Sequence, residues 1–278
     1  MPSNHRIALV TASQMHKPDT ETHLLVDVLR ERGVEAEIVC WDAHHDWKQF
    51  TLVLIRTPWD YFYRLEEFLA WAHSVSEVTC LINPYAVIEW NCRKHYLKEV
   101  SLKGIHTIPT LWFTQGSANM ADVLARSGWD EVVVKPTVSA GAFGTIRTPA
   151  TDPGCMAHLQ SLLEKGDAMV QPFAPDILHH GEVSLIYFAE TFSHAIRKVP
   201  RKGDYRVQDQ YGGIVEPHTP TDEEMALGRS VLGTTPSPTT YARVDLVRWE
   251  GKPALIELEV IEPMLFLEWA PDSAQRLA

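Results

Sequence analysis

The stretch Val132-Val-Val-Lys-Pro-Thr-Val-Ser-Ala-Gly-Ala-Phe-Gly-Thr145 says most about the fold of this chain. Its valines predict a buried strand over Glu131–Lys135, and Lys135 then opens a loop of small residues. Such a loop can lie close to phosphate groups and donate its backbone N–H groups, while the lysine neutralises their charge. The lysine precedes the glycines and no Gly-Lys-Ser or Gly-Lys-Thr follows, so this is not a Walker A loop. The alternative is a strand that ends in a solvated lysine and a flexible turn.

The C-terminal third predicts an antiparallel sheet with helices, an α+β arrangement. Residues 240–248 and 253–261 alternate apolar and polar side chains, and Trp249-Glu-Gly-Lys252 between them is typical of a hairpin turn. The other strands expected from about residue 130 onward are Glu131–Lys135, Ala168–Phe173, Val183–Ala189 and Phe192–Val199, with helices near 154–164 and 221–232.

This hairpin carries charged side chains at every second position. Residues two apart on a strand share a face, so Arg243 and Asp245 point together, as do Glu257 and Glu259. A three-residue loop at 250–252 puts Asp245 opposite Glu257 and Arg243 opposite Glu259, with the register open by one residue. Three clustered carboxylates repel one another unless a cation joins them, and hard oxygen ligands suit Mg²⁺ with nucleotide phosphates. The alternative is a solvent-facing strand pair with cross-strand ion pairs.

A third feature is the break of an apolar strand at prolines, in Ala168-Met-Val-Gln-Pro-Phe-Ala-Pro-Asp176. The exposed backbone of such a segment is a candidate hinge that reads the edge of an adenine. Glu182 follows at the head of the next strand, within reach of ribose hydroxyls. An ordinary proline-containing connection is the alternative. The hinge residues are Gln171, Pro172, Phe173 and Ala174.

The first hundred residues alternate strand and helix patterns and predict a small α/β layer with a mostly parallel sheet. A dinucleotide-binding site of the Rossmann type would show Gly-x-Gly-x-x-Gly after the first strand. The segment after Val10 is Thr-Ala-Ser-Gln-Met-His-Lys-Pro-Asp, without a glycine, which argues against a nicotinamide cofactor. The expected strands are Ile7–Val10, Ala36–Cys40 and Thr51–Ile55, with helices at 20–32 and 64–75.

Composition excludes several classes of partner. The 278 residues hold 25 Lys+Arg against 36 Asp+Glu, a net charge of −11, which argues against general nucleic-acid binding but not against a local phosphate site. No apolar run approaches the roughly 20 residues that span a bilayer, and no secretory signal is evident. The four cysteines are far apart, as in a reducing compartment. We therefore expect a cytoplasmic protein that binds neither nucleic acid nor membrane.

Several further residues are candidates for contact with a substrate. Arg56 and Trp59 lie just after a predicted strand, where a substrate loop would sit, although they equally suit a cap on a strand–helix turn. Lys198 and Arg206, with Arg243, supply the positive charge that an anionic substrate and phosphates require. For Arg206 a solvated loop is the alternative.

Taken in order, these features resemble the ATP-grasp superfamily over most of the chain. Asn91-Cys-Arg-Lys94-His-Tyr-Leu97 is similar to the segment that opens the family's central domain and carries its first phosphate-binding lysine. Three runs resemble the subgroup that contains the cycloserine-forming O-ureido-serine cyclo-ligase. Glutathione synthetases and D-alanine–D-alanine ligases are more distant relatives. The three runs are Ile55-Arg-Thr-Pro-Trp-Asp-Tyr61, Asn83-Pro-Tyr-Ala-Val-Ile-Glu-Trp-Asn91 and Glu257-Leu-Glu-Val-Ile-Glu-Pro263.

The resemblance implies an α/β and α+β fold, in which an N-terminal parallel α/β layer precedes two α+β subdomains that grip ATP. We expect the α/β layer at residues 1–83, the central subdomain with the glycine loop at 84–173, and the C-terminal subdomain with the metal site at 174–278. The implied activity is an ATP- and Mg²⁺-dependent carboxylate–amine ligation through an acyl phosphate. Its substrates would be a small amino-acid-like carboxylate and an amine, on the same or a second molecule.

The resemblance also implies roles for individual residues. Arg243 would stabilise the oxyanion of the tetrahedral intermediate, and with Lys135 and Arg206 it forms the expected catalytic set. Arg56, Trp59, Lys198 and Arg206 form the expected substrate set. The nucleotide set is Lys94, Lys135, Ser139, Gly141, Gly144, Gln171, Pro172, Phe173, Ala174 and Glu182, and the metal set is Asp245, Glu257 and Glu259.

The sequence departs from the family pattern in places. Relatives place Glu where Gln171 stands, which affects the contact with the adenine amino group. Their metal strand ends in Glu-x-Asn rather than Glu-x-Glu, and proline follows one residue later here, so Glu259 and Glu262 are both candidates for the second metal ligand. Two other functions stay open: a phosphotransferase on the same fold, and a nucleotide-binding module without turnover. The oligomeric state is also open, with a homodimer among the choices.

Overall fold

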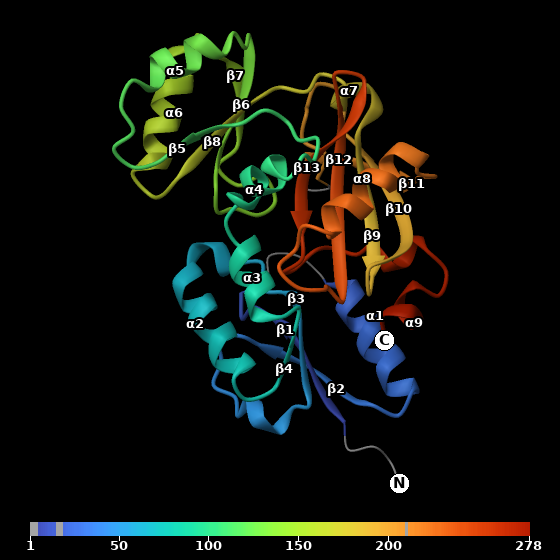
Figure 1. The fold of residues 1–278 in the computed structure, drawn as a ribbon. Helices are drawn as coiled ribbons and strands as arrows, with labels where there is room; N and C mark the ends of the chain where they lie inside the picture. The colour runs from blue at the N-terminus through green and yellow to red at the C-terminus, as the bar shows by residue number, and fades with distance from the viewer. Residues whose placement is uncertain (1–4, 15–18, 209–210) are drawn as a thin grey trace.

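The computed structural model describes residues 5–14, 19–208 and 211–278, and this part of the chain contains three β-sheets (Figure 1). The first sheet is parallel with strand order β2-β1-β3-β4, which confirms the predicted α/β layer. Its elements are β1 (Arg6–Thr11), α1 (Thr20–Glu31), β2 (Glu35–Cys40), η1 (Trp47–Gln49), β3 (Leu52–Thr57), η2 (Tyr61–Tyr63), α2 (Leu65–Ser76) and β4 (Cys80–Ile82).

The second sheet has the order β5-β8-β6-β7 and is antiparallel throughout. Its core packs under α6, whose start is fixed by the Asp152 side chain accepting a hydrogen bond from the Gly154 N–H. Two short helices that the sequence patterns did not predict, α3 and α4, lead into it. The elements are α3 (Tyr85–Asn91), α4 (Tyr96–Leu102), β5 (Leu111–Phe113), α5 (Met120–Ser127), β6 (Glu131–Pro136), β7 (Ile146–Pro149), α6 (Pro153–Leu163) and β8 (Ala168–Pro172).

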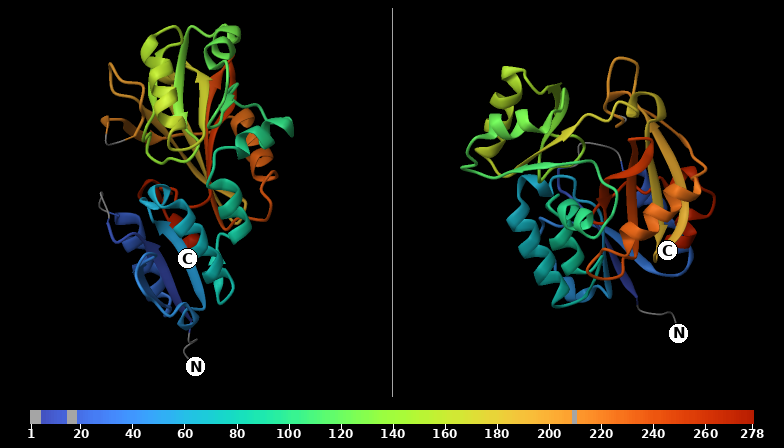
Figure 2. Two further views of the ribbon diagram at one scale, coloured as in Figure 1. Left: turned by 90° about the vertical axis from the view of Figure 1, so that its left-hand side faces the viewer. Right: turned by 45° about the horizontal axis from the view of Figure 1, so that its top comes forward.

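The third sheet has the order β11-β10-β9-β12-β13 and is also antiparallel, as predicted for the C-terminal third. In the left view of Figure 2 the first and second sheets lie at opposite ends of the molecule. None of the helices among the described residues is long and apolar enough to cross a membrane. The elements are α7 (Ile177–His180), β9 (Glu182–Phe188), β10 (Thr191–Val199), β11 (Ile214–Pro217), α8 (Asp222–Leu232), β12 (Tyr241–Trp249), β13 (Lys252–Glu259), η4 (Leu267–Trp269) and α9 (Ser273–Leu277).

The β12–β13 hairpin pairs the residues that the sequence predicted to pair, but it does so with a different turn from the predicted one. The turn has two residues, Glu250 and Gly251, rather than three, and both adopt positive φ angles of 51° and 79°. A β-bulge after Asp245 then adds one residue to the second strand. The two differences cancel, so that Asp245 pairs with Glu257 and Arg243 with Glu259.

The first sheet is joined to the third through buried side chains that hydrogen-bond to backbone. Asn83 is fully buried, donates to the carbonyl oxygens of Tyr241 (3.0 Å) and Val260 (2.7 Å), and accepts from the Thr240 N–H. Asn91 donates to the Leu258 carbonyl at 2.8 Å. The bonds to Leu258 and Val260 lie at the C-terminal end of β13, the last strand of the third sheet, and those to Tyr241 and Thr240 lie at the start of β12. They fix the N-terminal layer against the sheet that carries the charged hairpin.

These contacts cross the boundary predicted near residue 83, and the division into 1–83, 84–173 and 174–278 stays a prediction.

Candidate active site

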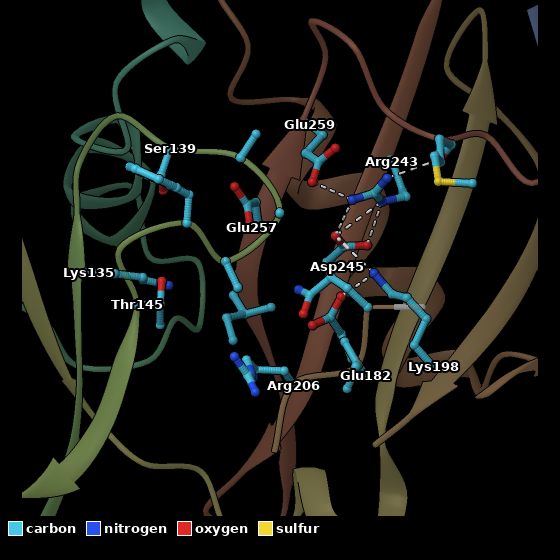
Figure 3. Close-up of a pocket in the computed structure, with 18 of the residues that line it drawn as sticks. Lys135, Ser139, Thr145, Glu182, Lys198, Arg206, Arg243, Asp245, Glu257 and Glu259 are labelled. Carbon is cyan, nitrogen blue, oxygen red and sulfur yellow. Dashed lines mark hydrogen bonds and ion pairs between the residues drawn. The ribbon is translucent and has the colours of Figure 1, made fainter. Parts of the chain in front are cut away.

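A cavity of about 540 Å³ lies between the second and third sheets and reaches the N-terminal layer. Figure 3 shows Lys135, Ser139 and Thr145 on one side and the charged residues of the third sheet on the other. All of the residues expected to bind nucleotide except Gly144 line this cavity, as do all three expected metal ligands. The second and third sheets thus bring together the cationic loop and the carboxylates, which are about a hundred residues apart in the sequence.

Asp245 is the centre of the charged network on the third sheet. It is only 2% exposed, and the Arg243 guanidinium donates to both of its oxygens, at 3.0 Å from Nε to Oδ1 and 2.9 Å from Nη2 to Oδ2. Ser184 donates its hydroxyl to Oδ1, and Lys198 Nζ lies 3.5 Å from Oδ2. Burial raises the pKa of Asp245, but Arg243 and Lys198 outweigh it and bring the pKa down to about 2. Asp245 is therefore held as a carboxylate.

The carboxylates around Asp245 are also paired in the free protein. Lys198 forms an ion pair with Glu182, Lys94 with Glu257, and Arg243 with Glu259. The dashed lines in Figure 3 trace the chain Glu259–Arg243–Asp245–Lys198–Glu182. Burial raises the pKa of Glu259 to about 7, with Glu257 and Asp245 adding to the rise and Arg243 opposing it. This site therefore holds more negative charge than its own cations neutralise.

The expected metal ligands suit Mg²⁺ in chemistry, because they present only carboxylate oxygens from adjacent strands. Each of them is engaged by a protein cation, and within residues 5–14, 19–208 and 211–278 no group of three His, Cys, Asp or Glu side chains is assembled to hold a metal. A metal would take these oxygens in exchange for Arg243 and Lys94.

Lys135 faces the carboxylates from the second sheet without a partner of its own. It is 8% exposed, and no hydrogen bond or ion pair to its ammonium group is formed by the described residues. Burial lowers the pKa of Lys135 to about 8, and the nearby Lys94 adds to this while Glu257 opposes it. A buried ammonium group facing a cavity is a ready site for an anion.

The loop after Lys135 depends on its glycines. Gly141 and Gly144 have φ angles of 57° and 68°, in the left-handed region that favours glycine. A Cβ at Gly144 would lie 3.3 Å from the Pro136 ring, so the loop also needs the absence of a side chain there. The Ser139 carbonyl accepts a 3.1 Å hydrogen bond from Lys94 Nζ. This bond ties the loop to the second lysine of the cavity.

Comparison with known proteins assigns the chain to a family. Residues 98–263 match the family described as prokaryotic glutathione synthetase, ATP-grasp domain, and residues 7–83 match the N-terminal domain of D-cycloserine synthetase DcsG. The cycloserine biosynthesis protein DcsG of Streptomyces lavendulae is 33% identical over 98% of this chain and 96% of its own length.

The chain belongs to the ATP-grasp ligase family.

Solved structures agree with this assignment. The crystal structure of D-cycloserine synthetase DcsG matches with a TM-score of 0.89 and 31% identity, over 98% of this chain and 96% of that one. D-alanine–D-alanine ligase from Bacillus anthracis shares the fold, with a TM-score of 0.70 at 15% identity over 98% and 91% of the two chains. This ATP-grasp protein is therefore an ATP-dependent ligase that forms carbon–nitrogen bonds.

The expected hinge, residues 171–174, lines the cavity, but the side chain of Gln171 is engaged in a hydrogen bond with the protein. Its amide nitrogen donates to the Thr110 hydroxyl at 3.0 Å, and the residue is 3% exposed. Pro172, Phe173 and Ala174 line the cavity beside it, and the Arg147 guanidinium lies 3.6 Å from the centre of the Phe173 ring. The backbone of this segment is thus the part available to a base.

The structure corrects the expectation for Arg56. Strand β3 continues to Thr57, so Arg56 lies within a strand and not in a loop after it. It is 1% exposed, is absent from the cavity lining, and donates to Glu21 (3.4 Å) and to the Pro263 carbonyl (3.2 Å). Glu21 in turn accepts from the Leu265 N–H at 2.8 Å. Arg56 therefore holds the segment after β13 in place and lies outside the lining of the cavity.

The other expected substrate residues do line the cavity. Trp59 donates its indole N–H to the Glu262 carbonyl at 3.2 Å, and Lys198 belongs to the carboxylate network. Arg206 lies on the loop between β10 and β11, donates to both Asp204 oxygens (3.1 and 2.9 Å), and stacks 3.6 Å from the centre of the Tyr211 ring. Its position at the cavity wall agrees with a role toward an anion but leaves its role a prediction.

Sequence analysis missed two residues that shape the site. Ser184 lies two residues after Glu182 on β9, so strand periodicity alone places both side chains on the same face. Phe143, at the tip of the glycine loop, packs against Phe62 and Tyr63 of η2, with ring centres 5.4 and 5.3 Å apart. This aromatic contact, which we name the loop latch, bridges the mouth of the cavity from the second sheet to the N-terminal layer.

We expect Phe143→Ala to raise the KM for ATP by about fivefold, because an aromatic pair contributes roughly 1 kcal/mol beyond its buried area. Without the loop latch the glycine loop closes less completely over the nucleotide. Steady-state ADP release measures the effect, and Tyr63→Ala, which removes the other side of one contact, should reproduce it. A KM within twofold of wild type in both variants would show that the latch plays no part.

The raised carboxyl pKa values predict the pH dependence of stability in the free ligase. Burial and neighbouring carboxylates raise the pKa of Glu259 to about 7 and that of Glu262 to about 8, so the folded state binds protons more tightly than the unfolded state. The stability that these two protonated carboxyl groups contribute is thus present at low pH and is lost as the pH rises through these values. We expect the free energy of unfolding to fall by about 2 kcal/mol between pH 6.5 and 8.5. Urea unfolding without nucleotide measures it, and a flat profile would contradict the prediction.

Proposed function

We propose that this chain is an ATP- and Mg²⁺-dependent ligase that joins a small amino-acid-like carboxylate to an amine, within one molecule or between two, through an acyl phosphate. The observation that carries the proposal is the single cavity in which Lys94 and Lys135 face Asp245, Glu257 and Glu259 under a glycine loop. Similarity to ligases named for cycloserine and glutathione synthesis supports the substrate class.

Lys94 and Lys135 would bind the phosphates of ATP, with the loop of Ser139, Gly141 and Gly144 above them. Lys135 has no competing partner among the described residues, whereas Lys94 must leave Glu257 to reach a phosphate. The backbone of Gln171, Pro172, Phe173 and Ala174 would hold the adenine, and Glu182 the ribose. In this arrangement the lysines neutralise charge on the nucleotide while backbone groups orient it.

Asp245, Glu257 and Glu259 would hold Mg²⁺, which when bound offsets the charge on the β- and γ-phosphates. The ion pairs of the free protein explain how these carboxylates stay buried without it. Arg243 occupies Asp245 and Glu259, and Lys94 occupies Glu257. Loading the site would redistribute these partners, with Lys94 turning to phosphate and Arg243 turning to the substrate.

In the first chemical step, a carboxylate oxygen of the substrate attacks the γ-phosphorus and ADP leaves, which yields the acyl phosphate. In the second, a neutral amine attacks the acyl carbon, phosphate leaves, and the nitrogen loses its extra proton. Arg243 would stabilise the oxyanion of this second step, and Arg206 and Lys198 would bind the anionic groups. The protein acts mainly by holding the reacting groups together and by neutralising charge.

The test is a phosphate-release screen over amino acids and amines with Mg²⁺ and ATP. A ligase forms ADP only when its carboxylate and its amine are both present, whether on one molecule or two. With a carboxylate labelled with ¹⁸O, the acyl phosphate route transfers one labelled oxygen to the released phosphate. Unlabelled phosphate in the presence of ligated product would rule out this intermediate, and loss of turnover with EDTA would show the need for the metal.

The screen also separates the other two functions. ADP formed with a carboxylate or alcohol acceptor and no amine, with a stable phosphorylated product, would identify a phosphotransferase. Tight ATP binding without ADP over the whole panel would identify a nucleotide-binding module. The retention of all three carboxylates and of both lysines on the cavity argues against the module.

A further inference from the structure

Glu262 is a buried carboxylate for which the protein supplies no partner. Its side chain lines the cavity and the residue is 8% exposed, yet no hydrogen bond or ion pair to its carboxylate is formed by the described part of the chain. The two glutamates before it differ in this respect, since Glu257 is paired with Lys94 and Glu259 with Arg243. An uncompensated charge at such a site costs several kcal/mol, so the carboxylate is arranged for a cation that comes from outside.

Three aromatic residues, Trp59, Tyr61 and Phe62, line the same cavity as Glu262. Trp59 donates its indole N–H to the Glu262 backbone oxygen at 3.2 Å, and Phe62 lines the same cavity. Tyr61 is 5% exposed, and its hydroxyl makes no hydrogen bond to any described residue. Burial raises the pKa of Tyr61 well above its usual value, and among charged groups Glu262 contributes most to this rise. The part of the cavity lined by Trp59, Tyr61 and Glu262, which we call the Glu262 corner, thus offers a carboxylate and a phenol oxygen that bond to no described residue.

This corner fits an organic ammonium group better than a metal ion. Mg²⁺ demands near-octahedral oxygen coordination, and the carboxylates proposed to hold it, on Asp245, Glu257 and Glu259, lie on the paired strands β12 and β13, whereas Glu262 follows the end of β13. An ammonium group needs only two or three acceptors and also gains from aromatic faces. Burial and Glu259 together raise the pKa of Glu262 to about 8, as expected for a carboxylate that lacks its cation.

We propose that Glu262 and the Tyr61 hydroxyl bind the ammonium group of an amino-acid substrate. This inference rests on the proposed function and makes it more specific, because it selects substrates with a free amino group over simple carboxylates. The ammonium group then lies toward the N-terminal layer, and the reacting carboxylate points toward Lys94 and Lys135. Glu262 becomes a specificity-determining residue and not the second metal ligand.

Isothermal titration with the enzyme held in Mg²⁺ and the non-hydrolysable analogue AMP-PNP tests this without turnover. The probes are the common amino acids in both enantiomers, followed by the desamino analogue of the tightest binder. We expect wild type to bind that amino acid at least tenfold more tightly than its desamino analogue. Glu262→Gln, which keeps the shape and removes the charge, should bring the two affinities within threefold of each other.

Two further variants complete the design. Tyr61→Phe keeps the ring and should weaken amino-acid binding by about threefold to tenfold, with ATP affinity unchanged. Glu31→Gln, at an exposed position on α1 away from the cavity, should keep the full discrimination. Circular dichroism of each variant establishes that it is folded, and Glu262→Gln should be at least as stable as wild type above pH 8, where the wild-type carboxyl is ionised without a partner.

The outcomes separate this inference from the proposed function. Unchanged discrimination in folded Glu262→Gln, no amino acid bound by wild type, or a raised Mg²⁺ requirement with normal amino-acid affinity would each overturn the ammonium site. Amino-acid binding that depends on Glu262, without ADP formation under any combination of substrates, would support the site and refute the ligase function. If wild type and Glu262→Gln both formed ADP with equal KM for the amino acid, the ligase function would be supported and the ammonium site refuted.

Discussion

Replacing Lys135 by alanine is expected to lower kcat/KM for ATP by roughly a thousandfold, the size of effect seen when one charge-stabilising group is removed from an active site. Lys135 is the buried cation of the cavity that no described residue neutralises, and its pKa of about 8 reflects that isolation. Bound phosphates would supply the missing negative charge. Measurements of ADP release and of ATP binding by calorimetry should both show the loss.

The stability of this variant gives a second readout. Because burial lowers the pKa of Lys135, removing the side chain relieves an unfavourable buried charge, and the Tm should be equal to or higher than that of wild type. Lys165→Ala, at an exposed position after α6, is the matched control and should change neither activity nor nucleotide affinity. Normal ATP affinity and turnover in Lys135→Ala would remove Lys135 from the site.

Asp245→Asn is expected to lower turnover by about 10²- to 10³-fold and to raise the Mg²⁺ concentration needed for half-maximal rate. The amide keeps the volume but removes the charge that Arg243 and Lys198 share. Each of these cations retains one partner, Glu259 and Glu182 respectively, so the fold should persist. Breaking a buried pair costs about 3 kcal/mol of stability, which urea unfolding would detect.

Ser184→Ala is the control for this prediction, because it removes one hydrogen bond to Asp245 and leaves the charge. It should cost about 1 kcal/mol of stability and leave the Mg²⁺ dependence close to that of wild type. If Asp245→Asn showed the Mg²⁺ dependence of wild type, Asp245 would be a structural partner of Arg243 and not a metal ligand.

The elements of the fold follow largely from local patterns in the sequence. Period-two alternation located β12 and β13, β9 and β10 were also predicted as strands, and apolar spacing located the helices around residues 20–32 and 64–75. The short elements between residues 80 and 127 escaped prediction. Each spans eight residues or fewer, so its periodicity is too short to recognise and its conformation depends on packing.

Part of the pairing in the candidate site could be predicted from the sequence. Strand periodicity put Asp245, Glu257 and Glu259 on one face and Arg243 opposite Glu259, yet Lys94, the partner of Glu257, is 163 residues away along the chain. The β12–β13 register came out right only because the shorter turn and the β-bulge offset each other. A bulge depends on tertiary surroundings, and so does the burial of Arg56 within β3, so neither could be inferred from local sequence.

The hydrogen bonds of Asn83 and Asn91 bear on how the three sheets can move relative to one another. Asn83 and Asn91 hydrogen-bond to backbone groups of the third sheet from the N-terminal side. Moving this side away from the third sheet would leave buried polar groups unpaired, at a free-energy cost of about 1–3 kcal/mol each. We therefore expect the N-terminal layer and the third sheet to move as one body. If the cavity opens to release product, the second sheet is the part we expect to move, together with Lys135 and its glycine loop. Such a movement would separate Lys135 from the carboxylates and leave Glu262 in its place beside the N-terminal layer.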